Sequence, residues 1–187
     1  MLVVCSASLA GAEPPPPPAS HLALSGHLGF NGPFSILGGE LEYAPLPNLA
    51  VAAGGGTNRG LTAQFGGASS YSIAGAVRGR WPVNTRWTAV LGVGGSTSDW
   101  HTEDHPLGES PYADASWRRV WWLDIDLGMA VRAGRVVVRF YIGHSGVLAK
   151  HGYHCDDLRG DVVCPYQMYE PSGATYAGVA VGWAFGV

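Results

Sequence analysis

The feature that most constrains this chain is a period-two alternation of large apolar residues with glycine and alanine. In the closing stretch TYAGVAVGWAFGV, residues 175–187, the odd positions from Val179 hold valine, Trp183 and Phe185, whereas the even positions hold only glycine and alanine. Side chains of a β-strand point alternately to opposite faces. A strand of a soluble barrel needs one polar face for water, but neither face here is polar. The alternation therefore predicts a strand whose large side chains contact lipid.

The same alternation occurs in seven segments upstream, near residues 21–30, 37–43, 49–54, 71–81, 86–94, 117–131 and 136–145. The links APLPN, PVN and AG are short and turn-like, and they alternate with longer links. All long loops then lie at one end of the molecule, and both ends of the predicted barrel lie at the other. A closed sheet is required in lipid, because no backbone group can stay unpaired there. We therefore predict an all-β fold, an eight-stranded antiparallel up-and-down transmembrane β-barrel.

Composition agrees with a barrel in a membrane. Hydrophobic residues make up 47% of the chain and charged residues only 13%, about half the charged share of a typical soluble domain. No stretch reaches the roughly 18 consecutive apolar residues of a transmembrane helix. The net charge is -3 and no lysine or arginine cluster occurs, which argues against a nucleic-acid partner. The expected partner of the outer wall is membrane lipid.

Three segments are expected along the chain. Residues 1–12 resemble the remnant of a signal peptide, since an apolar run ends in Ala10-Gly11-Ala12. Residues 13–20 contain five consecutive prolines and predict a stiff, extended leader. Residues 21–187 are expected to form the barrel. This order predicts an exported protein.

Aromatic residues are expected to form two interfacial girdles, one near the short turns and one near the long loops. The predicted interfacial aromatics are Tyr43, Tyr71, Trp81, Trp87, Trp117, Trp121, Trp183 and Phe185.

Charged residues are expected inside the barrel. An eight-stranded barrel has an interior just wide enough for side chains to fill. The positions on the small-residue face include four acids and three arginines: Glu40, Glu42, Asp124, Asp126, Arg78, Arg80 and Arg139. A nearly balanced set can form buried hydrogen-bonded pairs. We therefore predict a plugged lumen in which Arg78 and Arg139 are partners of the acids.

Two cysteines, Cys155 and Cys164, remain if residues 1–12 are removed. Export to an oxidising compartment favours a disulfide between them, although with His151 and His154 they could also form a Cys₂His₂ metal site. The stretch WHTEDH contains further possible metal ligands, His101, Glu103, Asp104 and His105. Without the ligand spacing of a known scaffold, a solvated loop is the expectation there, and no metal or other cofactor is predicted.

The stretch GHSG at residues 143–146 contains a histidine next to a serine. A Ser–His hydrolase needs the imidazole within hydrogen-bond reach of the hydroxyl. Adjacent residues of a strand face opposite sides, so His144 would point outward and Ser145 inward. No catalytic residues are predicted.

The eight-strand pattern, the alternation of short and long links and the terminal YAGVAVGWAF resemble the small outer-membrane barrels of Gram-negative bacteria, the OmpA transmembrane-domain and OmpX/Ail-like group. The resemblance covers residues 20–187 and implies location in the bacterial outer membrane. It also implies that the last strand is recognised by the barrel-assembly machinery. In that group the last strand usually ends on an aromatic residue, whereas here Phe185 is followed by Gly186 and Val187.

Three functions are compatible with this pattern. The first is a structural or surface-interaction role, in which the long external loops contact an extracellular ligand of unspecified identity. The second is a small channel or transport protein. The third is a lipid-modifying enzyme, since the resemblance includes outer-membrane deacylases and palmitoyltransferases; the deacylases carry their histidine and serine two residues apart on one face, which this chain does not match. The first is the prediction, and the protein is expected not to be an enzyme.

Overall fold

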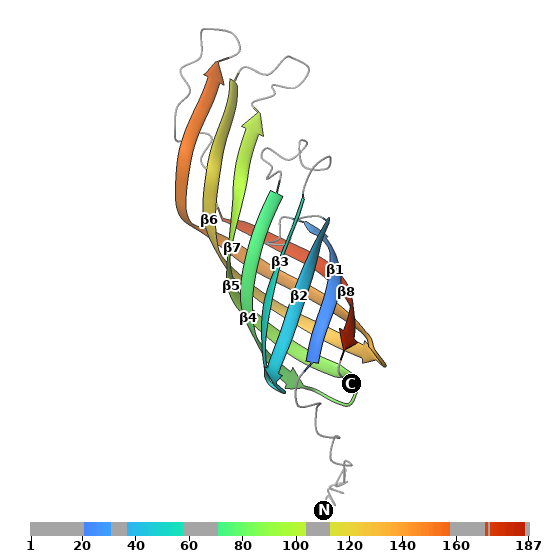
Figure 1. Cartoon of the computed structure of the whole chain (residues 1–187). Helices are drawn as coiled ribbons and strands as arrows, with labels where there is room; N and C mark the ends of the chain where they lie inside the picture. The colour runs from blue at the N-terminus through green and yellow to red at the C-terminus, as the bar shows by residue number, and fades with distance from the viewer. Residues whose placement is uncertain are drawn as a thin grey trace, which may run out of the picture.

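The computed structural model of this chain describes residues 21–30, 37–57, 71–103, 113–157, 171 and 173–185. They form eight strands: β1 (His21–Phe30), β2 (Leu37–Leu46), β3 (Leu49–Thr57), β4 (Tyr71–Pro82), β5 (Trp87–Glu103), β6 (Ala113–Ala133), β7 (Val136–Asp157) and β8 (Ala174–Phe185). Consecutive strands pair antiparallel, and β1 pairs with β8 to close the barrel (Figure 1). The predicted fold class is confirmed. Within these ranges no helix is long and apolar enough to cross a membrane.

Short turns join β2 to β3, β4 to β5 and β6 to β7 at residues 47–48, 83–86 and 134–135. Gly134 has a φ of 62°, a left-handed conformation that glycine adopts without steric cost. In the β4–β5 turn, Asn84 Oδ1 accepts hydrogen bonds from the backbone N–H groups of Arg86 and Trp87, both at 2.9 Å. β1 begins and β8 ends at the same end of the barrel as these turns (Figure 1), as the alternation of links predicts.

The outer wall is apolar on all sides of the barrel. Leu28, Ile73 and Leu127 are 61%, 62% and 59% exposed, although they are among the largest apolar residues of their strands. The buried side chains of the inner face include alanines such as Ala50 and Ala184. Bulky residues outside and small residues inside reverse the arrangement of a soluble protein, and they match the lipid-facing wall of a transmembrane barrel.

The glycines of the inner face are covered by large side chains from neighbouring strands. The ring and hydroxyl of Tyr141 occupy the space in which a Cβ at Gly178 would lie, and the ring of Tyr176 occupies the corresponding space at Gly143. The Gly/Ala face is therefore a packing requirement, because each large inward side chain needs a small residue on the strand beside it.

Strands β5, β6 and β7 are longer than the others. They contain 17, 21 and 22 residues, against 9 to 12 in the remaining strands. They rise beyond the rim of the barrel as a three-stranded sheet (Figure 1). We call this sheet, residues 99–103, 113–120 and 147–157, the projection. The sequence pattern places residues 99–103, 113–116 and 150–157 in loops, which is wrong: they are strands with polar residues and register irregularities that interrupt the alternation.

A β-bulge separates the projection from the barrel wall. In β6, Arg118 and Arg119 lie opposite the single residue Asp99 of β5. One extra residue reverses the alternation, so that side chains on the two sides of the bulge no longer follow the same inward and outward pattern. Trp117 is consequently only 2% exposed, and its predicted place among the lipid-facing aromatics is wrong. The other seven predicted interfacial aromatics are between 38% and 52% exposed.

We expect an arginine to be poorly tolerated halfway along the lipid-facing wall. Leu127 pairs with Leu91 and Ile142, both exposed apolar residues, so Leu127→Arg places a charge in hydrocarbon and should lower the free energy of unfolding by about 2–4 kcal/mol. Urea unfolding of the barrel in lipid vesicles measures this loss.

The matched control is Leu148→Arg. Leu148 is 65% exposed and lies level with Trp121, close to the rim, where the same substitution should cost only about 0–1 kcal/mol. Equal losses in the two variants would contradict the assignment of the wall to lipid.

Candidate functional site

The candidate site is the interior of the barrel, where all seven predicted charged residues point. Five of them are at least 93% buried: Glu40, Arg78, Asp124, Asp126 and Arg139. Five of the seven come together. We call these five, Glu40, Glu42, Arg78, Arg80 and Arg139, the Arg–Glu cluster.

Arg78 and Glu40 form the centre of the cluster. Arg78 Nη1 donates to Glu40 Oε1 at 2.7 Å and Arg78 Nη2 donates to Glu40 Oε2 at 2.5 Å. Two parallel bonds between a guanidinium and a carboxylate fix the orientation of both groups. Arg78 is fully buried and Glu40 is 2% exposed, so removal of either partner would leave the other charge without water to solvate it.

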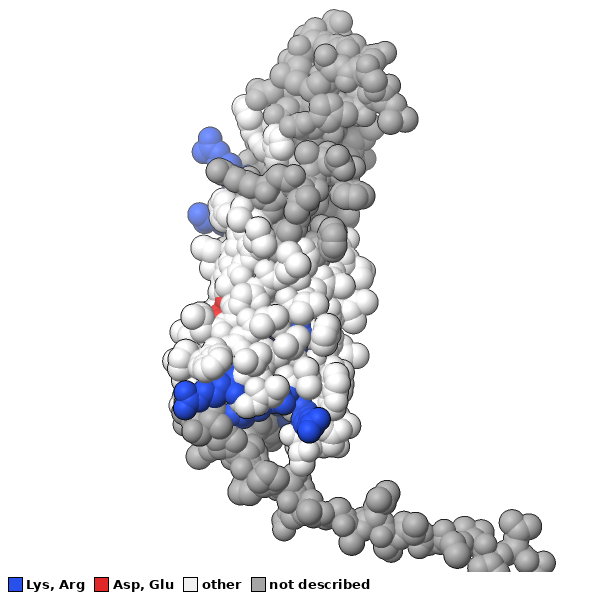
Figure 2. Space-filling view, turned by 90° about the vertical axis from the view of Figure 1, so that its right-hand side faces the viewer, with Lys and Arg blue, Asp and Glu red and all other residues white. Residues whose placement is uncertain are grey.

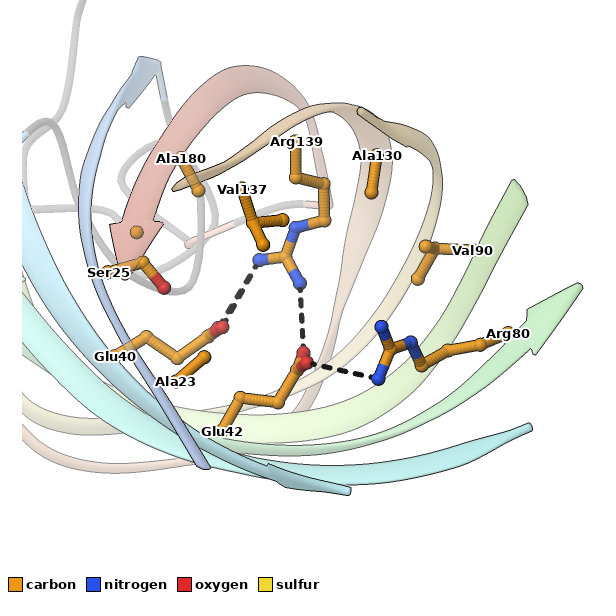
Figure 3. A pocket seen from close by; sticks show the side chains of 11 residues that line it. Ala23, Ser25, Glu40, Glu42, Arg80, Val90, Ala130, Val137, Arg139 and Ala180 are labelled. Atoms are coloured by element: carbon orange, nitrogen blue, oxygen red, sulfur yellow. Dashed lines mark hydrogen bonds and ion pairs between the residues drawn. The ribbon is translucent and has the colours of Figure 1, made fainter. Parts of the chain in front are cut away.

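Glu42 and two more arginines extend the cluster across the lumen. Arg78 Nη1 also donates to Glu42 Oε2 at 3.0 Å. Arg139, from the opposite wall, lies 3.3 Å from Glu40 and 3.6 Å from Glu42, and Arg80 lies 3.9 Å from Glu42 (Figure 3). The structure thus brings Arg78 and Arg139, the arginines named from the sequence, within ion-pair distance of the two glutamates.

Two residues outside the predicted set complete the hydrogen-bonded system. His27 Nε2 lies 3.6 Å from Glu40 Oε2, and His27 Nδ1 lies 3.3 Å from the hydroxyl of Tyr141. The guanidinium of Arg139 lies 5.4 Å from the centre of the Tyr141 ring. The signal for both was their inward parity on β1 and β7, since a polar side chain on the inner face of a narrow barrel must find partners there.

The two aspartates of β6 do not join the Arg–Glu cluster. Asp124 Oδ1 accepts a 2.5 Å hydrogen bond from Ser145 Oγ. Within the described strands Asp124 Oδ2 and Asp126 Oδ1 have no hydrogen-bond partner. The sequence pattern places these acids on the correct face. It does not show that the arginines pair with the glutamates of β2 instead.

A small cavity lies beside the cluster. Its volume is about 40 Å³, and its wall includes Glu42, Arg80, Val90, Val137 and Arg139 (Figure 3). A single water molecule needs roughly 10–15 Å³ of such volume, so the cavity has room for a few waters. This volume is far below that of a water-filled pore.

The serine and histidine of GHSG lie on opposite faces. His144 is exposed on the outer wall, with Nδ1 3.5 Å from Thr175 Oγ1. Ser145 is buried and bonded to Asp124. The imidazole is therefore directed away from the hydroxyl, an arrangement that does not fit a Ser–His nucleophile.

The remaining predicted positions that the structure describes lie in the projection. His101 is on β5, and His151, His154 and Cys155 are on β7. Asp104, His105 and Cys164 lie outside the described residues, so the Cys155–Cys164 disulfide stays a prediction. In the described ranges no group of three histidine, cysteine or acidic residues is placed to hold a metal ion.

Solved structures provide a comparison for the barrel. The N-terminal β-barrel domain of Pseudomonas aeruginosa OprF is similar over 89% of this chain and 96% of that domain, with a TM-score of 0.55 and 10% sequence identity. Neisserial surface protein A (TM-score 0.48, 9% identity, 90% and 96% covered) and Acinetobacter baumannii CarO (TM-score 0.46, 10% identity, 90% and 98% covered) also match. No protein-family model and no curated protein matches the sequence.

The similarity to the OprF domain shows the fold. This chain is a closed eight-stranded antiparallel barrel of the architecture found in bacterial outer membranes.

We expect loss of Arg78 to destabilise the barrel strongly. Arg78→Met keeps much of the side-chain volume but removes the bidentate partner of buried Glu40 and a hydrogen-bond donor to Glu42, so the free energy of unfolding should fall by about 3–5 kcal/mol. Reversible urea unfolding in lipid vesicles measures the change.

Arg135→Met is the control, because Arg135 is exposed in the β6–β7 turn and its loss should stay within about 0.5 kcal/mol. Adding Glu40→Gln to Arg78→Met should recover part of the loss. If Arg78→Met and Arg135→Met lower the free energy of unfolding by the same amount, the cluster does not stabilise the fold.

Proposed function

We propose that this protein is an outer-membrane barrel with a surface-interaction role, and that the projection presents the contact surface while the Arg–Glu cluster closes the lumen. The continuation of β5, β6 and β7 beyond the other five strands carries the proposal. A barrel that served only to span a membrane would not need a sheet above it.

Backbone pairing continues through the whole described projection. β5 and β6 pair as far as Glu103 with Asp114, and β6 and β7 as far as Ala113 with Asp157. A sheet with two interstrand ladders holds its shape better than an isolated hairpin. The projection can therefore present side chains in fixed positions, which lowers the entropy cost of binding a partner.

Aromatic packing stiffens the projection where it meets the barrel. Trp117, Val120 and Trp122 are buried, and Trp100 and Tyr153 pack against them. The rings of Trp117 and Tyr153 are 4.9 Å apart, and those of Trp100 and Trp122 are 5.8 Å apart. Burial of such large rings supplies the apolar core that a sheet outside the membrane needs.

The projection also exposes polar side chains. They include Arg118, Arg119, His151 and His154. Figure 2 shows basic side chains standing out from the upper part of the described surface and others gathered at its lower end, with few charged side chains on the wall between them. The exposed large side chains of that wall are apolar. This change from apolar to charged surface supports a membrane boundary near the bulge, with the projection in water.

The occupied lumen favours this role over transport. The Arg–Glu cluster joins β2, β4 and β7 by direct ion pairs, and the neighbouring cavity has a volume of only about 40 Å³. The outward position of His144 gives no support to a lipid-modifying enzyme. Outer-membrane lipid and the barrel-assembly machinery are the general partners, and the last strand with Phe185 is the proposed assembly signal.

The closed lumen can be tested by measuring conductance. In planar lipid bilayers the folded protein should give little or no steady conductance, because charged side chains fill an interior of this strand number. A 16-stranded porin reconstituted in parallel is the positive control. A stable, long-lived channel of porin size would favour transport over surface interaction.

The surface role can be tested by site-specific photo-crosslinking on living cells. A photoreactive amino acid at His151, on the projection, should give covalent adducts with extracellular molecules. The same amino acid at Val83, which is 61% exposed in the β4–β5 turn, is the matched control at the opposite end. Adducts absent from position 151, or equal at both positions in intact cells, would contradict the proposal.

A further inference from the structure

We propose that Asp124, Asp126 and Tyr176 form a binding site for a divalent cation with the oxygen preference of Ca²⁺. The site lies on the β6 and β8 side of the lumen, next to the Arg–Glu cluster but not part of it.

The two carboxylates are buried with free acceptor atoms. Asp124 and Asp126 are 5% and 7% exposed. Ser145 Oγ donates to Asp124 Oδ1, while Asp124 Oδ2 and Asp126 Oδ1 have no hydrogen-bond partner among the described residues. Because a buried charge without a partner is unfavourable, it is normally paired, protonated or bound to a metal ion.

The arginines of the lumen do not compensate these acids directly. Arg78 is an electrostatic neighbour of Asp126. Its Nη atoms, however, donate to Glu40 and Glu42. Arg139 likewise lies within ion-pair distance of both glutamates. The two aspartates therefore lie beside a cluster whose arginines pair with the glutamates.

Tyr176 supplies an independent observation that points to a ligand. It is 1% exposed, and its hydroxyl has no hydrogen-bond partner among the described residues. Its ring lies over Gly143, which is the register partner of Asp126. Both Asp126 and Asp124 are electrostatic neighbours of the phenol. A third buried oxygen with unused hydrogen-bonding capacity thus lies over β7, beside the strand that carries the acids.

Glycines leave room for these groups. A Cβ at Gly92 would collide with the carboxylate of Asp126, and a Cβ at Gly143 would collide with the Tyr176 ring and hydroxyl. The acid and the phenol can take their positions only because the strands beside them carry no side chain there.

The donor set selects the class of ion. Two carboxylates, a phenol and a serine hydroxyl are hard oxygen donors, which suit Ca²⁺ or Mg²⁺ better than Zn²⁺. Ca²⁺ accepts irregular sets of 6–8 oxygens, including waters, whereas Mg²⁺ demands near-octahedral geometry. With only two charged ligands, we infer a weak site, with a dissociation constant on the order of 10⁻⁴–10⁻³ M.

Calcium titration of the folded barrel in detergent tests the site. Thermal unfolding followed by circular dichroism, and equilibrium dialysis with radioactive calcium, are the two readouts. We expect one saturable Ca²⁺ per barrel and a midpoint of unfolding that rises with Ca²⁺, but not with NaCl at matched ionic strength. Asp126→Asn should abolish both effects, and Tyr176→Phe should weaken binding several-fold. Asp99→Asn, an acid of β5 outside the lumen, should leave both unchanged.

Three results would overturn the proposal. Absence of saturable binding to the wild-type barrel would mean that the acids hold protons or water. An equal response to NaCl would assign the site to a monovalent ion. Full calcium binding by Tyr176→Phe and Asp126→Asn would place the ion elsewhere. If Asp126→Asn does not fold, the number of Ca²⁺ ions bound by the wild-type barrel and the calcium binding of Tyr176→Phe still test the proposal.

Discussion

Closure of the hydrogen-bonded ladder is the constraint on which the rest of this structure depends. In hydrocarbon each backbone N–H and C=O needs a protein partner, and the pairing of β1 with β8, from Leu22 with Phe185 to Phe30 with Ala177, removes the last free edges. Eight strands closed in this way enclose a narrow interior. The narrow interior then decides which residues can point inward, and lipid decides which can point outward.

Packing inside the barrel follows a simple rule of large against small. Tyr141 lies over Gly178, Tyr176 over Gly143 and Asp126 over Gly92. Each of these glycines is therefore required as strictly as the large side chain that covers it. The same rule places the charged groups, because a guanidinium or carboxylate can reach across the lumen only where the intervening positions are small.

Much of the fold could be predicted from the sequence, because the two-residue period and the alternation of link lengths are local signals. They place Glu40, Arg78 and Arg139 inside and Leu127 and Trp183 outside, as observed. Two parts could not be predicted.

The face of Trp117 depends on the bulge at Arg118 and Arg119, whose extra residue has no signature in the pattern. The choice of partner for each acid depends on the stagger between strands, which local periodicity does not encode; as a result Asp124 binds Ser145 instead of an arginine.

The pairing of β1 with β8 also has a consequence for the order of folding. The other seven ladders join neighbours in the sequence, so their hairpins can form as soon as both strands exist. The first strand, in contrast, must wait for the last one to be synthesised. Contacts between such distant segments form slowly, and in the interval both edges are open to pairing with other chains. The chain therefore needs protection during transit to the membrane, and the final closure is the step at which assistance would accelerate folding most.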